Sequence, residues 1–358
     1  MTIENLLSEI LDSTKDKMLG LSPYDLGIKA KFTVVRQQIN LDLEAGFPTK
    51  LFEKSLLPEL QQACEQALKG YQVKLNLKSC IRPHRTQLVG QSLRGVKNTI
   101  AIASGKGGVG KSTVAVNLAL ALARAGARVG LLDADIYGPS IPLMLGKSEP
   151  VEVKDERYLP VMAHGIQAMS IGYLTDSGQA LIWRGPMLAK SMIQMLDLTL
   201  WDDLDYLFID LPPGTGDIQL SLVQKIPLTG ALIVTTPQNV ATLDAQKAIK
   251  MFEHTNINVL GLIENMSLHH CSQCGHQEAI FGSGGGKQLS DSFNVEMLGQ
   301  LPLDQQIARD CDQGLPTTAQ ENNDLAKPFN QAALRMAIAL AAKPLNYADK
   351  FPGIVVES

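Results

Sequence analysis

The sequence has few of the features that mark membrane or nucleic-acid-binding proteins. It contains no run of about 18 apolar residues, so no membrane-spanning helix is expected. Its 32 Lys and Arg residues are outnumbered by 36 Asp and Glu residues, a formal charge of −4 that argues against a strongly basic nucleic-acid-binding protein. Aromatic residues make up only 5% of the chain, too few for a surface that stacks bases. We therefore expect neither nucleic acid nor membrane among its partners.

Cysteine is also scarce, and the chain does not begin like a secreted protein. Five cysteines in 358 residues are too few and too scattered for a disulfide framework. The segment Met1–Leu21 is acidic and amphipathic, whereas a secretory signal has a basic start and an apolar run. We therefore expect a cytoplasmic protein whose thiols stay reduced and available for metal binding or redox chemistry.

The first 95 residues differ in charge and pattern from the rest. They carry 13 basic and 10 acidic residues, or +3, which leaves 19 basic against 26 acidic residues, or −7, for the remainder. Alternating and periodic apolar residues predict a helix, two strands, a helix and a strand at Ile3–Leu11, Lys31–Val35, Gln38–Leu43, Phe52–Gly70 and Gln72–Lys78. This order predicts a small α+β domain over residues 1–80, followed by a polar, basic linker over residues 81–95. We expect this linker to be a solvated tether, and the alternative is that its charge forms a contact surface.

From Val96 onward, short apolar runs alternate with helical patterns. The runs are Val96–Ala103, Val129–Leu132, Tyr206–Ile209, Ala231–Thr235 and Val259–Ile263, and the helical patterns include Lys111–Arg124, Asp244–Thr255 and Asn330–Ala342. Apolar strands that alternate with helices predict an α/β fold, a doubly wound and mostly parallel sheet covered on both faces. We assign this domain to residues 96–345 and expect residues 346–358 to form a flexible tail.

A phosphate-binding loop follows the first of these strands. It comprises Gly105, Lys106, Gly107, Gly108, Val109, Gly110, Lys111 and Ser112, which fits the P-loop pattern G-x-x-x-x-G-K-S/T. Its glycines let backbone N–H groups point at phosphate oxygens, and the helix that begins at Lys111 adds its positive end. We expect Lys111 to reach the β- and γ-phosphates of ATP, Ser112 to ligate Mg²⁺, and Thr113 to bond the α-phosphate.

Aspartates stand at the ends of two further strands. Asp133 and Asp135 end the second strand, and Asp210 ends the hydrophobic strand that precedes a loop rich in glycine and proline, Leu211–Asp217. Strand carboxyl ends face the phosphates in a doubly wound sheet. We therefore expect Asp135 to orient the attacking water and Asp210 to hold Mg²⁺ through a water. Asp133 has two alternative roles, to assist Mg²⁺ or to hold Lys111.

One C-x-x-C pair, Cys271 and Cys274, lies in an insertion after the strand Val259–Ile263. Two thiolates are half of a four-coordinate site, and a two-fold homodimer would complete it with four cysteines. Such a site suits a 4Fe-4S cluster or zinc equally well. A thiol redox switch, or a zinc knuckle completed by His270 or His276, are further alternatives. We expect the remaining thiols, Cys64, Cys80 and Cys311, to be buried and structural.

Several motifs together resemble a known family. The string GKGGVGKST (Gly105–Thr113) resembles the deviant P-loop of the ATPases that include MinD, ParA, the nitrogenase iron protein and the Mrp/ApbC carriers. Over about residues 95–340, the chain is similar to the Mrp/ApbC family of iron–sulfur cluster carriers. The motifs that carry this likeness are DADIYGPSIP, DLPPGTGD, IENMS followed by C-x-x-C-G-H, and LGQLPLD.

This resemblance implies roles that the residues alone do not. Lys106 would be a signature lysine that reaches the nucleotide of a second subunit, and Asp135 would be the catalytic carboxylate. Ile136–Ser140 would form switch I, and Asn265, with Pro237 and Gln238, would contact adenine. The cysteine pair would bridge a labile cluster between two protomers, with cluster donors and apoprotein acceptors as partners.

The N-terminal domain looks like the MIP18-type domain that often precedes such ATPases. It lacks an Asp-Pro-Glu turn near Ser22–Asp25, which leaves its role open.

Two other functions compete with the carrier. A MinD/ParA-type positioning ATPase would need a C-terminal amphipathic membrane helix or a basic DNA-binding face, and Asn330–Ala342 instead reads as a core-packing helix. A nucleotide-stabilised, zinc-bridged scaffold would need no ATP turnover. A nitrogenase-type electron donor would share the cluster geometry but neither the N-terminal domain nor this cysteine spacing.

Overall fold

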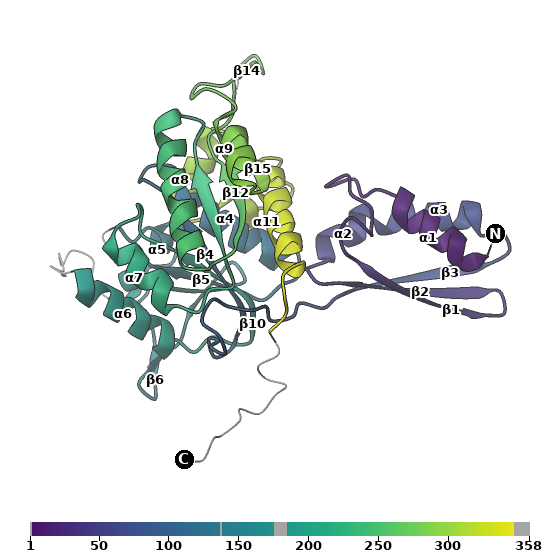
Figure 1. Cartoon of the computed structure of the whole chain (residues 1–358), viewed down its shortest axis with the longest axis horizontal. Coiled ribbons are helices and arrows are strands. Elements are labelled where there is room, and N and C mark those ends of the chain that lie inside the picture. Colours follow the sequence, from purple (N-terminus) through teal and green to yellow (C-terminus); the bar gives the residue numbers. More distant parts are fainter. Residues whose placement is uncertain (1, 137, 175–184, 272, 347–358) are drawn as a thin grey trace.

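The computed structural model describes residues 2–136, 138–174, 185–271 and 273–346. Apart from Asn346, the predicted tail lies outside these residues, as does Tyr137 of the predicted switch I. The chain folds into two bodies joined side by side (Figure 1). We call residues 2–80 the small domain and residues 96–345 the large domain.

The small domain is a sheet of three strands with helices on one face (Figure 1). Strand β2 lies in the centre, antiparallel to β1 and parallel to β3. The elements are α1 (Ile3–Ser13), β1 (Lys29–Val35), β2 (Gln38–Ala45), α2 (Lys50–Ser55), α3 (Leu57–Ala67) and β3 (Gln72–Ser79). Along β2, Ile39, Leu41 and Leu43 are buried beneath the helices, which confirms the predicted alternation.

The helix predicted over Phe52–Gly70 is two helices, so that prediction was wrong in detail. The break lies at Leu56, between α2 and α3, and Pro58 occupies the first turn of α3. Proline has no N–H to donate to the preceding turn, and its ring clashes there, so one continuous helix cannot form. The position of Pro58 was a signal for this break.

The large domain is built on a sheet of eight strands in the order β15-β12-β11-β4-β10-β5-β9-β8. All neighbouring strands are parallel except the edge pair β8 and β9, which confirms the predicted mostly parallel sheet. The strands are β4 (Val96–Ala103), β5 (Val129–Asp133), β8 (Val161–Ala163), β9 (Ile166–Ser170), β10 (Leu204–Asp210), β11 (Gly230–Thr235), β12 (Val259–Glu264) and β15 (Met297–Gln300). Two hairpins, β6 (Val153–Lys154) with β7 (Arg157–Tyr158) and β13 (His269–His270) with β14 (Gln277–Glu278), lie outside this sheet.

Helices cover both faces of this sheet, as a doubly wound fold requires. Ile100 and Ile102 of β4 belong to one hydrophobic core, whereas Ala101 and Ala103 belong to a second, because neighbouring side chains of a strand point to opposite faces. The helices are α4 (Lys111–Arg124), α5 (Ile141–Met144), α6 (Gly185–Leu198), α7 (Asp217–Lys225), α8 (Asn239–His254), α9 (Gly285–Phe293), α10 (Gln305–Asp312) and α11 (Ala326–Ala341), with 3-10 turns at Ile171–Tyr173 and Thr317–Ala319. None of the helices described here is long and apolar enough to cross a membrane.

Part of the segment 81–95 is bonded to the large domain, which contradicts a fully solvated tether and favours the alternative of a contact surface. The Gln87 side chain donates to the carbonyls of Val223 and Ile226 at 2.9 and 2.7 Å and accepts from the Leu228 N–H at 2.7 Å. His84 is also buried. Polar side chains in this segment therefore satisfy backbone groups near the end of α7, which a sequence pattern does not reveal.

The two domains also share a core. Buried Phe47 of the small domain and Leu340 of α11 belong to the same hydrophobic cluster. The backbone approach is close, because a Cβ atom on Gly46 would lie 3.0 Å from the Cβ of Ala341. In addition, the Gln331 side chain donates to the Met18 carbonyl at 2.8 Å. The small domain is thus held against α11 by packing as well as by the chain connection.

Candidate functional site

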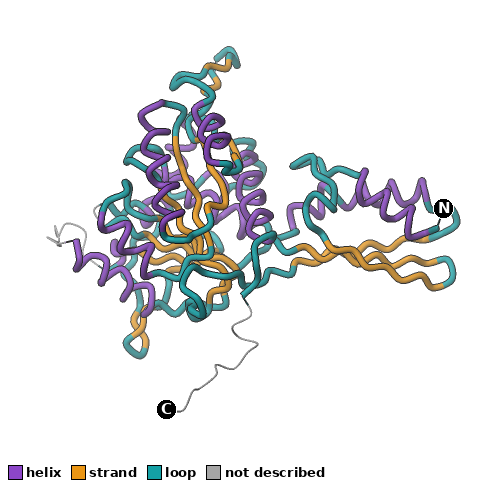
Figure 2. The backbone as a smooth tube through the Cα atoms, in the orientation of Figure 1, coloured by secondary structure: helices purple, strands orange, loops and turns teal. Residues whose placement is uncertain are grey.

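The carboxyl ends of the parallel strands meet at one end of the large domain. The β13–β14 hairpin projects from the large domain at the top of Figure 2. The P-loop joins β4 to α4 at this edge. Gly108 and Gly110 have left-handed φ angles of 82° and 79°, which favour glycine. Gly110 is the N-cap of α4 and contributes no side-chain cap, so the N–H groups of the first turn stay available to an anion.

The P-loop, Asp135 and Pro213 of the loop Leu211–Asp217, which we call switch II, line one cavity of about 220 Å³. The sequence placed these three segments at strand ends, and the structure brings them together. The cavity is lined by Ser104, Lys106, Gly107, Gly108, Gly110, Lys111, Ser112, Thr113, Asp135, Ser140, Met144 and Pro213. Phosphates bound here would meet the loop backbone, two lysines and the carboxylate proposed to act on water.

Gly105 lets helix α8 approach the P-loop. A Cβ atom at this position would lie 2.1 Å from the carbonyl carbon of Asp244, far inside van der Waals contact. Only glycine therefore fits between β4 and α8. The P-loop pattern requires a glycine here, but the neighbour that excludes other residues is visible only in the structure.

Lys111 and Asp210 form a buried ion pair at the base of the site. The Lys111 ammonium lies 2.6 Å from one Asp210 oxygen, and the Ser112 hydroxyl donates to the other oxygen at 2.6 Å. Lys111 is 6% exposed and Asp210 is fully buried. A serine hydroxyl next to a carboxylate is a donor set that suits Mg²⁺. Since Lys111 pairs with Asp210, the alternative expectation that Asp133 holds this lysine was wrong.

Asp133 fixes the loop that carries Asp135. Its carboxylate accepts hydrogen bonds from the backbone N–H of Asp135 at 3.1 Å and of Ile141 at 3.3 Å, and from the Ser170 hydroxyl at 3.1 Å. Burial, and next the charge of nearby Asp210, raise the pKa of Asp133 to about 7. Ser170 lies on β9 and carried no sequence signal, because a serine at a strand end is ordinary.

Asp135 lies between the phosphate cavity and a second, larger cavity of about 820 Å³. Pro213 of switch II also lines both cavities. Switch II is bonded to the residue that precedes the P-loop, because the Gly214 N–H donates to the Ser104 carbonyl at 3.0 Å. A change in the P-loop on nucleotide binding would therefore reach switch II through a direct backbone contact.

Asn265 contacts the P-loop directly. Its side-chain amide donates to the Val109 carbonyl at 2.9 Å, and its backbone N–H donates to the Thr235 carbonyl at 2.8 Å. Gly110 gives it room, since a Cβ there would lie 2.3 Å from the Asn265 amide nitrogen. The family resemblance implied that Asn265 contacts adenine, and this contact stays a prediction.

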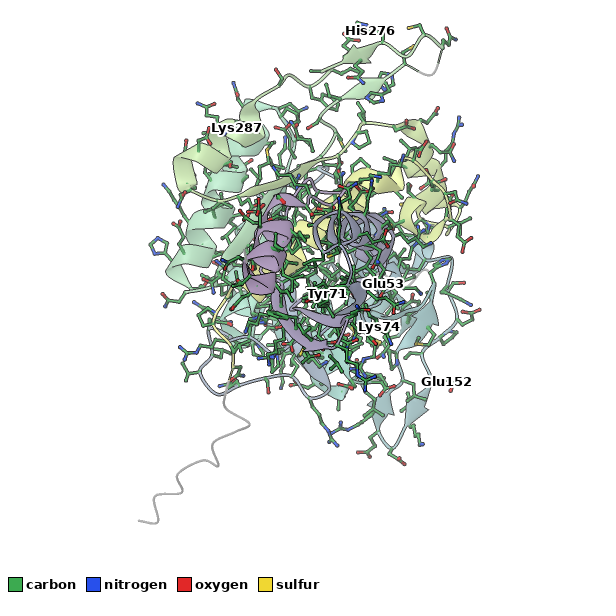
Figure 3. The ribbon with its side chains drawn as sticks, turned by 90° about the vertical axis from the view of Figure 1, so that its right-hand side faces the viewer. Glu53, Tyr71, Lys74, Glu152, His276 and Lys287 are labelled. Atoms are coloured by element: carbon green, nitrogen blue, oxygen red, sulfur yellow. The ribbon has the colours of Figure 1, made fainter. Side chains whose placement is uncertain are left out.

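The cysteine pair occupies a hairpin that projects from the large domain (Figure 1). His276 of this hairpin lies at the extremity of the molecule in Figure 3. The Cys271 N–H donates to the His276 carbonyl at 2.9 Å, and the Gly275 N–H donates to the Cys271 carbonyl at 2.8 Å. Cys271 is half-buried and Cys274 is exposed. The backbone N–H groups of Cys274 and Gln273 lower the pKa of Cys271, which favours the thiolate that binds metals.

Within the residues described, no third ligand joins this pair. No group of three His, Cys, Asp or Glu side chains there is placed to hold a metal ion. His269 at the hairpin's base instead bonds the Leu303 carbonyl through Nδ1 at 3.1 Å. These findings give no support to a knuckle completed by His270 or His276 within one chain.

A buried carboxylate anchors the base of the hairpin. Glu264 is 1% exposed and accepts from the Ser267 hydroxyl at 2.5 Å, the Gly286 N–H at 2.7 Å and the Gln300 amide at 2.7 Å. The next residue, Asn265, bonds the P-loop. Glu264 was missed because a glutamate at a strand end looks like an ordinary exposed charge.

Two of the other three thiols are structural, as predicted. Cys64 and Cys311 are buried, and burial raises the pKa of each thiol to about 11. Cys80 is only partly buried, so its predicted burial was wrong. It follows β3 at the junction of the two domains, where the chain leaves the small sheet.

Comparisons with known proteins agree with this site. Residues 95–337 match a family model described as ParA, NUBPL iron-transfer P-loop NTPase. The chain is 55% identical over 252 residues to a Haemophilus influenzae protein named "Iron-sulfur cluster carrier protein", a match that covers 70% of this chain and 68% of the relative. A Pseudomonas fragi protein of the same name is 51% identical over 73% of this chain and 92% of its own length.

Solved structures agree on the fold. An Archaeoglobus fulgidus nucleotide-binding protein in complex with ADP aligns with a TM-score of 0.57 and 39% identity, over 64% of this chain and 91% of its own. The Pyrococcus furiosus cell division ATPase MinD aligns with a TM-score of 0.51 and 24% identity, over 66% of this chain and 97% of its own. The MinD likeness shows the fold alone. The matched family covers the P-loop, both switch segments and the cysteine hairpin, and this chain is a P-loop ATPase that belongs to the NUBPL iron-transfer family.

Proposed function

We propose that this ATPase carries an iron–sulfur cluster between two copies of the chain and delivers it to apoproteins. The hairpin of Cys271 and Cys274 is the observation that carries the proposal. It presents two accessible thiols at the nucleotide edge, and one chain supplies no third ligand among its described residues. The names of the relatives support the same cargo.

The cargo would be a 4Fe-4S cluster bound by four thiolates. A two-fold axis between two hairpins would supply the second pair, because a closed dimer presents the same surface twice. The lowered pKa of Cys271 suits a ligand that must be deprotonated. The same four thiolates would suit zinc, so a zinc-bridged scaffold is the second candidate.

ATP hydrolysis would use the residues already gathered at the P-loop. Lys111 and the loop backbone would hold the phosphates, while Ser112 and Asp210 would hold Mg²⁺, which neutralises phosphate charge when bound. Asp135, positioned through Asp133, would orient the attacking water. Lys106 lines the phosphate cavity and would reach the nucleotide of the second copy.

Nucleotide binding would be coupled to the hairpin through two adjacent residues. Asn265 bonds the Val109 carbonyl in the P-loop, and Glu264 anchors the base of the hairpin. A ligand that shifts the loop carbonyl would thus act on the chain that leads to Cys271. To test the coupling, cluster transfer to an acceptor is timed with and without Mg-ATP, and we expect the rates to differ. Equal rates would refute the coupling but not the carrier role.

The decisive experiment measures iron, acid-labile sulfide and zinc in anaerobically reconstituted protein. We expect iron and sulfide in the wild type, and their loss in a Cys271→Ala/Cys274→Ala variant that still binds ATP. Cys80→Ser is the matched control, because it removes an accessible thiol elsewhere, and it should keep the full cluster content. Cluster retained in the double variant would contradict the ligand assignment. Zinc without sulfide in the wild type would favour the scaffold.

Further expectations follow from the carrier role. Free thiols need a reducing compartment, so we place the protein in the cytoplasm, with cluster donors and apoprotein acceptors rather than nucleic acid or membrane as its partners. The small domain has the element order helix, two strands, two helices and a strand. This order supports its assignment as a divergent MIP18-type domain.

A further inference from the structure

A cavity of about 250 Å³ is lined by residues of the small domain, of the segment 81–95 and of the C-terminal end of α11. Figure 1 shows the place where the small domain meets α11. It is remote in the chain from the P-loop and the cysteine hairpin, and the proposed carrier function does not use it. Residues of four segments line it, and those with reactive or charged side chains are Asp25, Lys29, Glu44, Cys80, Arg82 and His84.

Cys80 is the accessible thiol of this cavity. Its backbone N–H donates to the Ala45 carbonyl at 2.7 Å, which fixes the position of the residue. Arg82 lines the same cavity, and Cys80, followed by Glu44, raises the pKa of Arg82. Arg82 also forms an ion pair with Glu44 at 2.6 Å. Cys80 is therefore a partly exposed thiol that shares its cavity with a cation able to bind a charged ligand.

The ring of His84 has a buried nitrogen, Nε2, that no donor among the described residues contacts. The ring is 3% exposed, and its Nδ1 lies 3.0 Å from the Asn98 side-chain oxygen. The Asn98 amide nitrogen donates to the carbonyls of Arg82 and Asp205, so its oxygen must accept and Nδ1 must donate. Nε2 is then an acceptor, and it has no hydrogen-bond partner among the residues described.

The protonation of His84 agrees with this assignment. Burial is the largest influence on the ring and lowers the pKa of His84, whereas Asn98 and the Ala341 carbonyl act in the opposite direction. In the neutral ring, Nε2 cannot donate to that carbonyl. Buried polar atoms are nearly always satisfied, so an unpaired acceptor that belongs to a cavity-lining residue indicates a ligand with a donor group.

The charges around the cavity are balanced. Lys29 and Arg82 supply two positive charges, and Asp25 and Glu44 supply two negative charges. Lys29 forms no ion pair within the part of the chain that the structure describes. Such a lining suits a ligand that carries both an ammonium and a carboxylate group, rather than a simple anion.

We propose that this cavity is a thiol–disulfide exchange site, in which Cys80 reacts with the disulfide of a small zwitterionic aminothiol. The Cys80 thiol gives its proton to solvent, and Sγ attacks one sulfur of the disulfide. A bond from Sγ to that sulfur forms, the original S–S bond breaks, and the departing thiolate takes up a proton. Cys80 is oxidised to a mixed disulfide as half of the small disulfide is reduced to its thiol.

The test measures the rate at which Cys80 forms a mixed disulfide, by mass spectrometry of alkylated peptides from the reduced full-length protein. The probes are glutathione disulfide, cystine and the neutral bis(2-hydroxyethyl) disulfide. We expect one or both zwitterionic probes to react about tenfold faster than the neutral one, since charge-assisted contacts orient them. The faster of the two identifies the source of the aminothiol. Cys64 and Cys311, which are buried, should stay unmodified.

Variants of the arginine decide whether the cavity recognises the probe. Arg82→Gln should slow the zwitterionic probes about fivefold to tenfold and change the neutral rate less than about twofold, while Arg82→Lys restores part of the loss. Arg85→Gln is the matched control, because Arg85 is exposed in the same segment but does not line the cavity.

Three outcomes would overturn the proposal. They are no reaction at Cys80, equal rates for neutral and zwitterionic probes, and equal slowing of all probes by Arg82→Gln. None of these measurements depends on cluster binding, so the proposed carrier function and this site fail separately.

Discussion

Replacing Lys111 by methionine should destabilise the nucleotide-free large domain, because the change leaves the Asp210 carboxylate buried without its cation. The two groups are 2.6 Å apart, Lys111 is 6% exposed and Asp210 is fully buried. Removing one partner of such a pair costs about 3–5 kcal/mol, most of it from the charge left behind. The Ser112 hydroxyl, 2.6 Å from Asp210, still donates to this carboxylate in the variant. We therefore expect the loss in free energy of unfolding to lie near the lower end of this range.

The measurement is hydrogen exchange of α4 and β10 peptides at increasing urea, which reports on the large domain without assuming that both domains unfold together. A loss of about 3 kcal/mol corresponds to opening that is roughly a hundredfold more frequent. A Lys111→Met/Asp210→Asn double variant should recover most of this loss, since neither partner is then charged.

Lys106→Met is the matched control for this prediction. Lys106 lies in the same loop, is half-exposed and forms no ion pair within the described residues, so its replacement should cost less than about 0.5 kcal/mol. The reasoning would be refuted if Lys111→Met were no more destabilising than this control. A double variant as unstable as Lys111→Met alone would refute it as well, because the loss would then not come from the unpaired carboxylate.

Three further predictions concern the same site. Because burial raises the pKa of Asp133 to about 7, the folded protein holds this proton more tightly than the unfolded chain, and the free energy of unfolding should fall as pH rises from about 4 to 7. Asp133→Asn should lack this part of the slope in urea titrations at pH 5 to 8, and an unchanged slope would contradict the assignment. Gly105→Ala places a Cβ 2.1 Å from the Asp244 carbonyl carbon, so it should lower the free energy of unfolding by about 1–3 kcal/mol and weaken ATP binding. Gly107→Ala is the control and should have little effect, because the nearest neighbour of its Cβ lies at 3.9 Å. Equal effects of the two variants in urea and ATP titrations would count against the clash. Asn265→Ala leaves a P-loop carbonyl unpaired and should cost about 1–3 kcal/mol and reduce affinity for a fluorescent ATP analogue, and unaltered affinity would argue against its place at the nucleotide.

Local patterns in the sequence were sufficient to predict the elements that form the site. The predicted strand Val96–Ala103 and helix Lys111–Arg124 have the same bounds in the structure. Apolar runs, glycine positions and aspartates at strand ends are properties of neighbouring residues, so they are encoded within a few positions of the chain. The break before Pro58 was encoded in the same way, although the helical pattern around it concealed the signal.

The sequence therefore determined that this chain has a P-loop, a mostly parallel sheet and a cysteine pair at one edge of it. Only the tertiary structure decided which groups meet. Lys111 pairs with Asp210, 99 positions away, and Asn265 bonds the P-loop across 156 positions. Cys80 and His84 likewise line one cavity together with residues of α11, from the far end of the chain. Pairing and burial are set by packing between distant segments, and no local pattern of residue types specifies which of several carboxylates or thiols will face a given partner.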